Sequence, residues 1–406
     1  MTTTISLEDV RAAAVRIAGH LPLTPAVPAP RLGDMAGCRL HLKLESQHAT
    51  GSFKERGALN KLLSLKDEER KAGVIAMSAG NHAQAVACHA TRLGIRSTIV
   101  MPSFTPFTKV ERTESLGAKV ELHGDTLSDA AAFARELATR EGLTFVHPYD
   151  DPFVAAGQGT AALEFLDAVP DLDTLVVPIG GGGLIAGMAT AAKALKPGIR
   201  VVGVQCSQYP AMRQALAGQP IACGGVTIAE GIAVKAPGGM TLPIVRTLVD
   251  EVVEVSEARL EEAVYRLSTM QKLVAEGAGA AALAAVLDNP EAFKGRNVGI
   301  VVSGGNIDSR ILAQVLMRGL VYEGRIVRLR IGITDAPGAL ARVTHLLGEA
   351  GANIVEVYHQ RLFHNVPVKM AEVDVLLETR DQTHVQALMV RMKEAGFPTS
   401  LMTDVS

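Results

Sequence analysis

Short apolar runs alternate with longer amphipathic stretches along most of this chain of 406 residues. The apolar runs have the length of buried strands, and the stretches between them have helical spacing. Such an alternation predicts an α/β fold with parallel sheets that helices cover on both faces. We expect a helix at 7–17, a proline-rich loop at 21–30, and strands at 40–44, 74–77, 97–101, 119–122, 144–146, 174–178, 201–204 and 298–302.

The pattern changes after residue 324, where the order becomes strand, helix, strand, strand, helix, strand. This order predicts a separate α+β module of the ferredoxin-like type. We place the linker near 322–325, so that one domain covers 1–323 and the other covers 324–406. The second domain has no obvious nucleophile or metal cluster, which favours a role in binding and pairing. Its expected elements are 325–333, 339–350, 351–357, 368–377, 383–395 and 399–402.

Composition narrows the class of protein. With 48% hydrophobic residues, the chain is long enough for a large core and more than one domain. A net charge of -2 and a pI near 6.6 argue against nucleic-acid binding. No apolar run reaches membrane-spanning length and no basic leader precedes one, so we expect a soluble protein without a targeting segment. The scattered cysteines favour a reducing cytoplasm over disulfides or structural zinc; they are Cys38, Cys88, Cys206 and Cys223.

The segment from Glu45 to Ala58 contains the lysine with the strongest chemical signal. Thr50-Gly51-Ser52 follows a predicted strand and offers turn and N-cap chemistry for a helix at 53–65. Lys54 then lies in the first helical turn, where the positive end of the helix dipole lowers its pKa. A neutral amine is what Schiff-base chemistry requires. The alternative is that Lys54, Glu55 and Arg56 form a solvated helix face.

The loop Ser78-Ala79-Gly80-Asn81-His82 follows the strand at 74–77 and precedes a helix expected at 83–93. Ligands of parallel sheets gather at such carboxyl ends. Backbone N–H groups of this turn could hold a substrate carboxylate, while Asn81 donates to a cofactor oxygen. The alternative is that Asn81 is an ordinary helix cap.

The four glycines Gly180, Gly181, Gly182 and Gly183 follow the buried strand at 174–178. Without side chains, several N–H groups can converge on one phosphate at a helix N-terminus. No Gly-Lys-Ser/Thr follows, so this is not a nucleotide P-loop, and no acidic residue ends the next strand, as a dinucleotide site would require. A single small phosphate fits better. The alternative is a flexible turn.

Two further positions carry candidate chemistry. Ser303 directly follows the strand at 298–302, and its hydroxyl can bond a ring nitrogen without imposing a charge. Glu276 opens a helix of very small residues. A carboxylate there either compensates the helix dipole or, if it faces the same site, orients substrate or water.

In combination, these motifs closely resemble the fold type II pyridoxal-phosphate enzymes, whose fold is tryptophan synthase β-like. The matching segments are 51–58, 78–82, 180–183 and 303–306, in that order. Within these enzymes, Pro148 to Pro152, Ala156 to Gly159 and Glu276 to Ala280 resemble the threonine ammonia-lyases, also called threonine dehydratases. The resemblance covers about 5–320, and it implies a small subdomain, roughly 48–150, inserted in a larger one. The remainder resembles an ACT domain, an amino-acid-sensing module.

The resemblance implies a role for each site residue. Lys54 would hold pyridoxal 5'-phosphate covalently and later act as the general base, with Phe53 beside the ring. Asn81 would contact the cofactor 3-hydroxyl, the four glycines its phosphate, and Ser303 its pyridine nitrogen. The substrate carboxylate would lie against Ser78, Ala79, Gly80, Asn81 and His82, with Glu276 also facing the substrate.

The implied reaction is β-elimination of L-threonine to 2-oxobutanoate and ammonia, or of L-serine to pyruvate. Related serine racemases carry an acid/base serine where this chain has Ala79, so we expect elimination rather than racemisation. They also bind a divalent cation after the strand that corresponds to 201–204. The segment 205–208 offers no acidic cluster, so we expect no divalent metal, while a monovalent ion stays open. Alternatives are serine or 3-hydroxyaspartate elimination or racemisation and, in a different class, a non-catalytic amino-acid sensor.

For the C-terminal domain we expect an effector site between paired modules, with isoleucine or valine as candidate effectors. Exposed helix-start N–H groups suit an amino acid's carboxylate, and adjacent strands could pair across subunits of a homodimer or homotetramer. The alternative is a domain that only oligomerises. The expected regulatory residues are Asp335, Gly338, Ala339, Leu340, Asn353 and Ile354.

Overall fold

The computed structural model describes residues 5–360 and 367–402. The chain forms two compact units, Met1–Ile307 and Asp308–Ser406. Helix α14 (Ser309–Tyr322), assigned above to the first domain, falls in the second unit, where it leads directly into strand β11 (Ile326–Thr334). Among the described residues, no helix combines the length and hydrophobicity that crossing a membrane requires.

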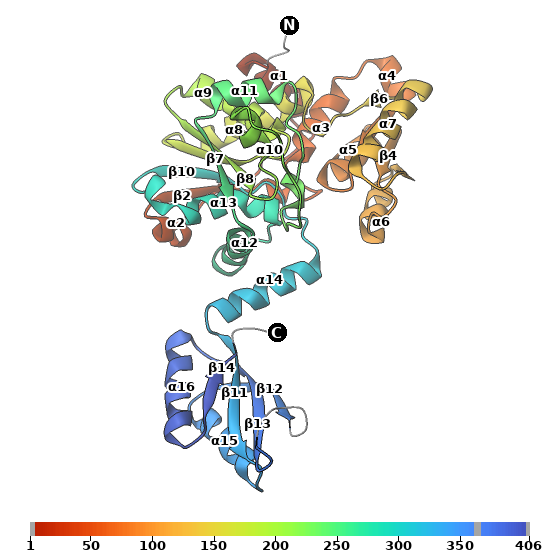
Figure 1. Cartoon of the computed structure of the whole chain (residues 1–406). Helices are drawn as coiled ribbons and strands as arrows, with labels where there is room; N and C mark the ends of the chain where they lie inside the picture. The colour runs from red at the N-terminus through yellow and green to blue at the C-terminus, as the bar shows by residue number, and fades with distance from the viewer. Residues whose placement is uncertain (1–4, 361–366, 403–406) are drawn as a thin grey trace. The chain divides into compact units, whose positions relative to one another are not determined.

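The larger sheet of the first unit has six strands in the order β1-β2-β10-β7-β8-β9. All neighbours are parallel except β1 and β2. Helices cover both faces, with α8, α9 and α11 on one side and α2, α12 and α13 on the other (Figure 1). Its strands are β1 (Ala26–Pro28), β2 (Arg39–Lys43), β7 (Thr174–Pro178), β8 (Arg200–Cys206), β9 (Glu251–Val255) and β10 (Asn297–Val301).

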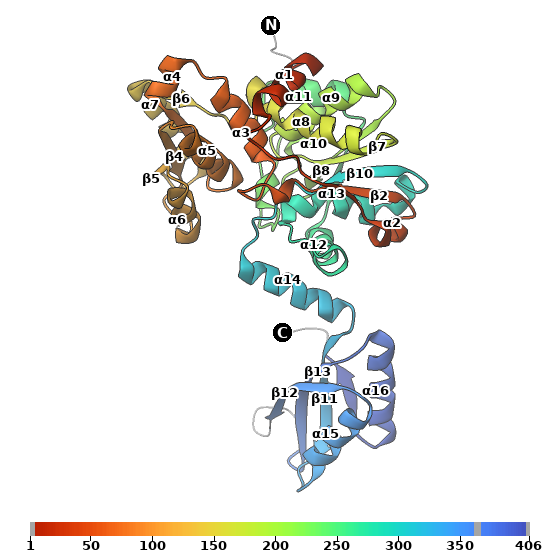
Figure 2. The same ribbon diagram turned by 180° about the vertical axis from the view of Figure 1, so that it is seen from behind.

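The smaller sheet has four parallel strands in the order β5-β4-β3-β6. In sequence it lies between β2 and β7 of the larger sheet, and helices α3 and α8 border the insertion. Figure 2 shows its helices gathered beside the larger sheet. Its strands are β3 (Val74–Met77), β4 (Ser97–Met101), β5 (Lys119–Leu122) and β6 (Thr144–Phe145).

Helices fill the remainder of the first unit. Alanine and glycine dominate α9 and α13, which lets both helices pack closely in the core. The α-helices are α1 (Leu7–Ile17), α2 (Pro30–Ala36), α3 (Lys54–Leu63), α4 (Asp67–Ala72), α5 (Asn81–Arg92), α6 (Phe107–Ser115), α7 (Leu127–Glu141), α8 (Pro152–Ala168), α9 (Gly183–Leu195), α10 (Ala211–Leu216), α11 (Thr241–Leu248), α12 (Glu257–Gln271) and α13 (Gly277–Asp288).

The second unit contains one antiparallel sheet in the order β12-β13-β11-β14. Alternate residues of β11 and β13 are buried against the two helices, as the period-2 pattern predicts. The βαββαβ order expected from the sequence is present. Its other elements are α15 (Ala339–Glu349), β12 (Asn353–Gln360), β13 (Met370–Glu378), α16 (Gln382–Glu394) and β14 (Thr399–Leu401).

Candidate active site

Lys54 is the first residue of α3, as expected, but its helix is not capped as expected. Phe53 holds the N-cap position and makes no side-chain cap bond, so the capping role assigned to Thr50-Gly51-Ser52 is wrong. The segment instead pairs with the loop after β10, where the Phe53 N–H donates to the Ser303 carbonyl over 3.0 Å. This pairing joins two of the expected site loops directly.

The Lys54 amine lies in a site that disfavours its charge. Its Nζ donates to the Pro148 carbonyl oxygen over 2.7 Å and lies 5.1 Å from the centre of the Phe53 ring. Burial lowers the pKa of Lys54 to about 8, against an opposing effect of Glu276. Burial is therefore a cause of the lowered pKa that the sequence reasoning, which named only the helix dipole, did not include. About a tenth of the amine is therefore neutral at pH 7, far more than for an ordinary lysine.

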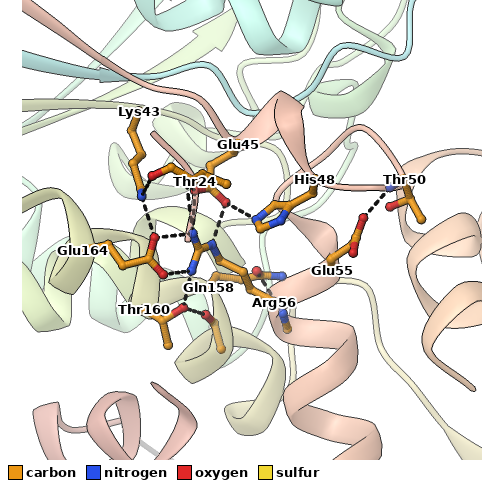
Figure 3. A network of polar contacts seen from close by, with 12 residues as sticks. Thr24, Lys43, Glu45, His48, Thr50, Glu55, Arg56, Gln158, Thr160 and Glu164 are labelled. Atoms are coloured by element: carbon orange, nitrogen blue, oxygen red, sulfur yellow. Dashed lines mark hydrogen bonds and ion pairs between the residues drawn. The ribbon is translucent and has the colours of Figure 1, made fainter. Parts of the chain in front are cut away.

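The residues after Lys54 are buried, which contradicts the alternative of a solvated helix face. The Arg56 guanidinium lies between two carboxylates, with Nε 2.6 Å from Glu45 and Nη1 2.5 Å from Glu164 (Figure 3). Lys43 Nζ completes the cluster, 2.5 Å from Glu164 and 2.7 Å from the Thr24 carbonyl. Burial alone would raise the pKa of Glu45, but Arg56 holds it well below its usual range. The cluster anchors the start of α3, two residues from Lys54.

A second buried pair connects α3 to α5. The Glu55 carboxylate contacts His89 Nε2 over 2.9 Å and accepts from the Thr50 N–H. Both side chains are fully enclosed. Burial opposes ionisation of Glu55, yet these bonds lower its pKa overall. This pair fixes the position of α3 relative to α5, and these two helices begin at Lys54 and Asn81.

Asn81 is the first residue of α5 and not its cap. Gly80 holds the N-cap position, and no side chain caps the helix. The Asn81 amide Nδ2 instead donates to Glu276 Oε1 over 2.7 Å. Of the two roles weighed for Asn81, capping is therefore wrong.

Glu276 likewise bonds to another site residue, Asn81, and makes no cap bond to its own helix. It holds the N-cap position of α13 without a side-chain cap bond. Burial raises the pKa of Glu276 to about 7, while the bond from Asn81 opposes the rise. Glu276 and Lys54 also influence each other's pKa, so a carboxyl and an amine that both titrate near neutrality share this site.

The loop before Asn81 presents backbone groups. The Gly80 N–H donates to Ser78 Oγ over 3.1 Å, whereas among the described residues the amides of Ala79, Asn81 and His82 meet no protein acceptor. The His82 ring turns inward, with Nε2 2.9 Å from the Val146 carbonyl, and burial lowers its pKa to about 3. His82 thus offers its backbone N–H to a carboxylate, while its imidazole ring is neutral and bonded to Val146.

The glycine loop leads from β7 into α9, with Gly182 at φ 100 as the N-cap. A Cβ at Gly181 would overlap the Tyr149 ring, and one at Gly183 would lie 2.9 Å from the Tyr149 carbonyl. Among the described residues, no amide N–H of Gly180 to Gly183 donates to a protein oxygen. The Gly181 carbonyl accepts from Thr241 Oγ1 over 2.6 Å, which orients the loop. The flexible-turn alternative is therefore disfavoured.

Ser303 is buried at the end of β10, where its Oγ lies 3.3 Å from the Ala278 carbonyl. This long bond leaves the lone pairs of the hydroxyl available, and no acidic or basic group bonds to it among the described residues.

The side-chain amide of Gln205, at the end of β8, bonds to the backbone of Tyr209 and Arg213. This amide therefore stabilises the turn that follows β8.

These groups fit pyridoxal phosphate. The glycine loop offers free N–H donors in a cradle that a side chain would fill, and Lys54 offers a partly neutral amine. Asn81 has a second amide proton, and Ser303 a neutral hydroxyl. N–H donors for a phosphate and a hydroxyl, an amine for an aldehyde and a neutral hydroxyl for a ring nitrogen are all present.

Sequence reasoning missed several residues that shape the site. Pro148 and Tyr149 lie in the segment Pro148 to Pro152, which resembles the threonine ammonia-lyases. That resemblance marked the segment, but no role was assigned to either residue. Asp150 accepts from the N–H groups of Gly239 and Met240 over 2.9 Å each, which fixes the loop that leads into α11 at Thr241. Nothing in the sequence around Thr241 indicates its contact with Gly181.

Comparison with protein families places the chain. A model described as "Pyridoxal-phosphate dependent enzyme" matches residues 17–304. The chain therefore belongs to this family of pyridoxal-phosphate-dependent enzymes. The family and the α/β fold expected from the sequence are confirmed.

Named relatives narrow the class further. An L-threonine ammonia-lyase of Thermotoga maritima is 43% identical over 95% of this chain and 96% of its own. One of Geobacter sulfurreducens is 42% identical over 94% and 96%. Among solved structures, a threonine deaminase from Solanum lycopersicum matches with a TM-score of 0.72 and 32% identity, over 78% of this chain and 90% of that one. Maize serine racemase matches with a TM-score of 0.73 and 35% identity, over 78% and 100%.

Proposed function

We propose that this protein is a pyridoxal-phosphate-dependent L-threonine ammonia-lyase that also accepts L-serine. It would convert L-threonine to 2-oxobutanoate and ammonia, and L-serine to pyruvate and ammonia. The observation that carries the proposal is the Lys54 amine, held partly neutral by burial among donors that fit the coenzyme. The relatives of nearly equal length named L-threonine ammonia-lyase support the choice of substrate.

When bound, the coenzyme supplies an aldehyde that captures amino groups and a ring that acidifies the substrate Cα–H. Lys54 Nζ takes the Cα proton as general base, for which a pKa of about 8 is well matched. The free amides of Ala79, Asn81 and His82 bind the substrate carboxylate at the start of α5. The amides of Gly180 to Gly183 anchor the coenzyme phosphate, and Asn81 donates to its 3-hydroxyl.

Two features favour elimination over racemisation. Ser303 presents a neutral hydroxyl to the ring nitrogen, so no carboxylate keeps that nitrogen protonated and charge is not stored in the ring. Ala79 supplies no proton donor in the asparagine loop. Loss of the β-hydroxyl is therefore the favoured fate of the activated substrate.

The test is a panel of L-threonine, L-serine, D-serine and 3-hydroxyaspartate with the purified, coenzyme-loaded protein. We expect 2-oxo acid and ammonia in equal amounts, a higher kcat/KM for L-threonine than for 3-hydroxyaspartate, and no D-serine from L-serine. Inversion of serine faster than its elimination would favour the racemase alternative, which the likeness to maize serine racemase raises. A colourless protein without turnover would favour a non-catalytic sensor.

We further propose that the second unit is an ACT domain that senses isoleucine or valine. In one module, Asp335, Gly338, Ala339 and Leu340 follow the end of β11, whereas Asn353 and Ile354 begin β12 at the opposite end of the sheet. One copy therefore does not unite the expected residues, and a site built from both groups requires a second module. Such pairing supports a homodimer or homotetramer, and the four free cysteines suit the cytoplasm.

Deletion of residues after Glu323 tests the regulatory role. We expect the full chain to change its KM for threonine severalfold in the presence of isoleucine or valine, and the shortened chain to keep turnover without that response. An Asn353→Ala variant of the full chain guards against loss of fold in the deletion. Equal sensitivity of all three proteins would exclude the second unit as the effector site.

A further inference from the structure

Asn81 is one link in a chain of hydrogen bonds that connects three of the site loops. Asn306 Nδ2 donates to the Thr50 carbonyl over 2.7 Å and to Asn81 Oδ1 over 2.8 Å. Asn81 Nδ2 in turn donates to Glu276 Oε1. The chain therefore runs from the segment before Lys54, through the loops after β10 and β3, to the start of α13.

The direction of this chain is fixed by the backbone carbonyl at its Thr50 end. A backbone carbonyl such as that of Thr50 only accepts, so Asn306 must turn its Nδ2 toward it. The same nitrogen then meets Asn81 Oδ1, which leaves Asn81 Nδ2 on the side of Glu276. Both protons of Asn306 Nδ2 are used, whereas Asn81 Nδ2 keeps one proton free.

Glycines make room for the chain. A Cβ at Gly51 would lie 2.6 Å from Asn306 Oδ1, and one at Gly304 would overlap Glu276 Oε1 and lie 3.2 Å from Asn81 Nδ2. The Gly305 N–H also donates to the Gly51 carbonyl over 2.9 Å, so the two backbones meet where these side chains pass. The packing of these side chains therefore requires glycine at positions 51 and 304.

We propose that Asn306 is a positioning residue that sets the polarity of the Asn81 amide, so that an N–H rather than a carbonyl faces the coenzyme. The inference rests on the proposed function, because it concerns the contact of Asn81 with the coenzyme oxygen. A reversed amide would direct Oδ1 at that oxygen and at Glu276, and both hydrogen bonds in which Asn81 is the donor would be lost. Asn306 itself need not touch the coenzyme or the substrate.

Asn306→Asp tests the polarity. The new carboxylate cannot donate, so Asn81 turns its Nδ2 toward it and its Oδ1 toward Glu276. We expect the dissociation constant for pyridoxal phosphate to rise at least about tenfold, measured by titrating the absorbance of the bound coenzyme. The melting temperature of the coenzyme-free full chain should fall by at least about 3 °C. Asn289→Asp, an exposed residue with no side-chain bond among those described, is the matched control for the change in charge.

The double variant Asn306→Asp with Glu276→Gln separates positioning from simple loss of structure. The glutamine amide can donate to the reversed Asn81, so the bonds from position 276 through Asn81 to position 306 form again in the opposite direction, while the Thr50 carbonyl stays without its donor. We expect at least half of the lost melting temperature to return, while the dissociation constant stays at least about tenfold raised. Glu276→Gln alone keeps an acceptor for Asn81 and should change this constant less than about threefold.

Two results would overturn the inference. One is an Asn306→Asp variant that binds the coenzyme like Asn289→Asp. The other is a double variant in which stability and coenzyme affinity recover together, because the polarity of Asn81 would then be irrelevant. Failure of the proposed function has a different signature, since the unaltered protein would bind no pyridoxal phosphate or release no ammonia from threonine.

Discussion

Replacing Lys54 with alanine is expected to lower kcat for threonine by at least about 10⁴-fold. The side chain supplies both the covalent anchor and the base in the proposed reaction. Among the described residues, no other side-chain amine bonds to the Pro148 carbonyl, so no neighbouring amine can replace Lys54 there. The fold should survive, because burial of this ammonium is unfavourable, as its lowered pKa shows. The measurement is ammonia release, with melting curves to confirm folding.

Borohydride gives this prediction a second readout. Reduction of the unaltered, coenzyme-loaded protein should bleach its colour and attach the coenzyme to Lys54, where peptide mass spectrometry would find it. Lys66→Ala, an exposed lysine outside the site, should label and turn over normally. Substantial ammonia release by Lys54→Ala would defeat the assignment of the base, and labelling at another lysine would defeat the anchor.

Replacing Arg56 with methionine should destabilise the protein by about 3–5 kcal/mol. Arg56 is 1% exposed, and its removal leaves Glu45 buried without its main positive partner while Glu164 keeps only Lys43. Methionine preserves much of the apolar volume, so the loss reports mainly the unpaired charge. Chemical unfolding of the full chain measures the effect.

Arg39→Met is the matched control for this second prediction. Arg39 pairs with Asp171 over 3.4 Å, but 71% of its side chain is exposed. Exposed pairs of this kind contribute about 0–1 kcal/mol. If the two variants lost equal stability, the buried cluster would have no special role in holding the start of α3.

Most of the parallel strands could be predicted, because a strand buried on both faces appears as a continuous apolar run. The run Val74–Met77 is bounded as expected, and so are β4, β5 and β7. Strand β1 lies in what looked like a proline-rich loop, and β9, Glu251–Val255, alternates with acidic residues. Both are edge strands with weak apolar signals, and their pairing depends on distant partners.

The sequence positions of the candidate site residues could be predicted one by one, but the hydrogen bonds between them could not. Lys54, Asn81 and Ser303 follow strands in the sequence, and that position alone marks them as candidates. The partner of Asn81 lies 195 residues away at Glu276, and no local pattern encodes such a bond. For the same reason, helix-cap rules failed at Ser52 and Asn81, where contacts between loops replace local capping.

The pairing of β2 with β10 has a consequence for how the protein is made. Arg39 of β2 lies opposite Asn297 of β10. Strand β2 is synthesised early but can form this pairing only after β10 has left the ribosome. At ~5–20 residues per second, that delay is on the order of tens of seconds. Until then Ser303, which follows β10, cannot join Lys54 and Asn81, and β2 exposes an unpaired edge to other chains and to chaperones. The complete set of candidate coenzyme contacts can therefore form only after synthesis has passed the last strand of the larger sheet.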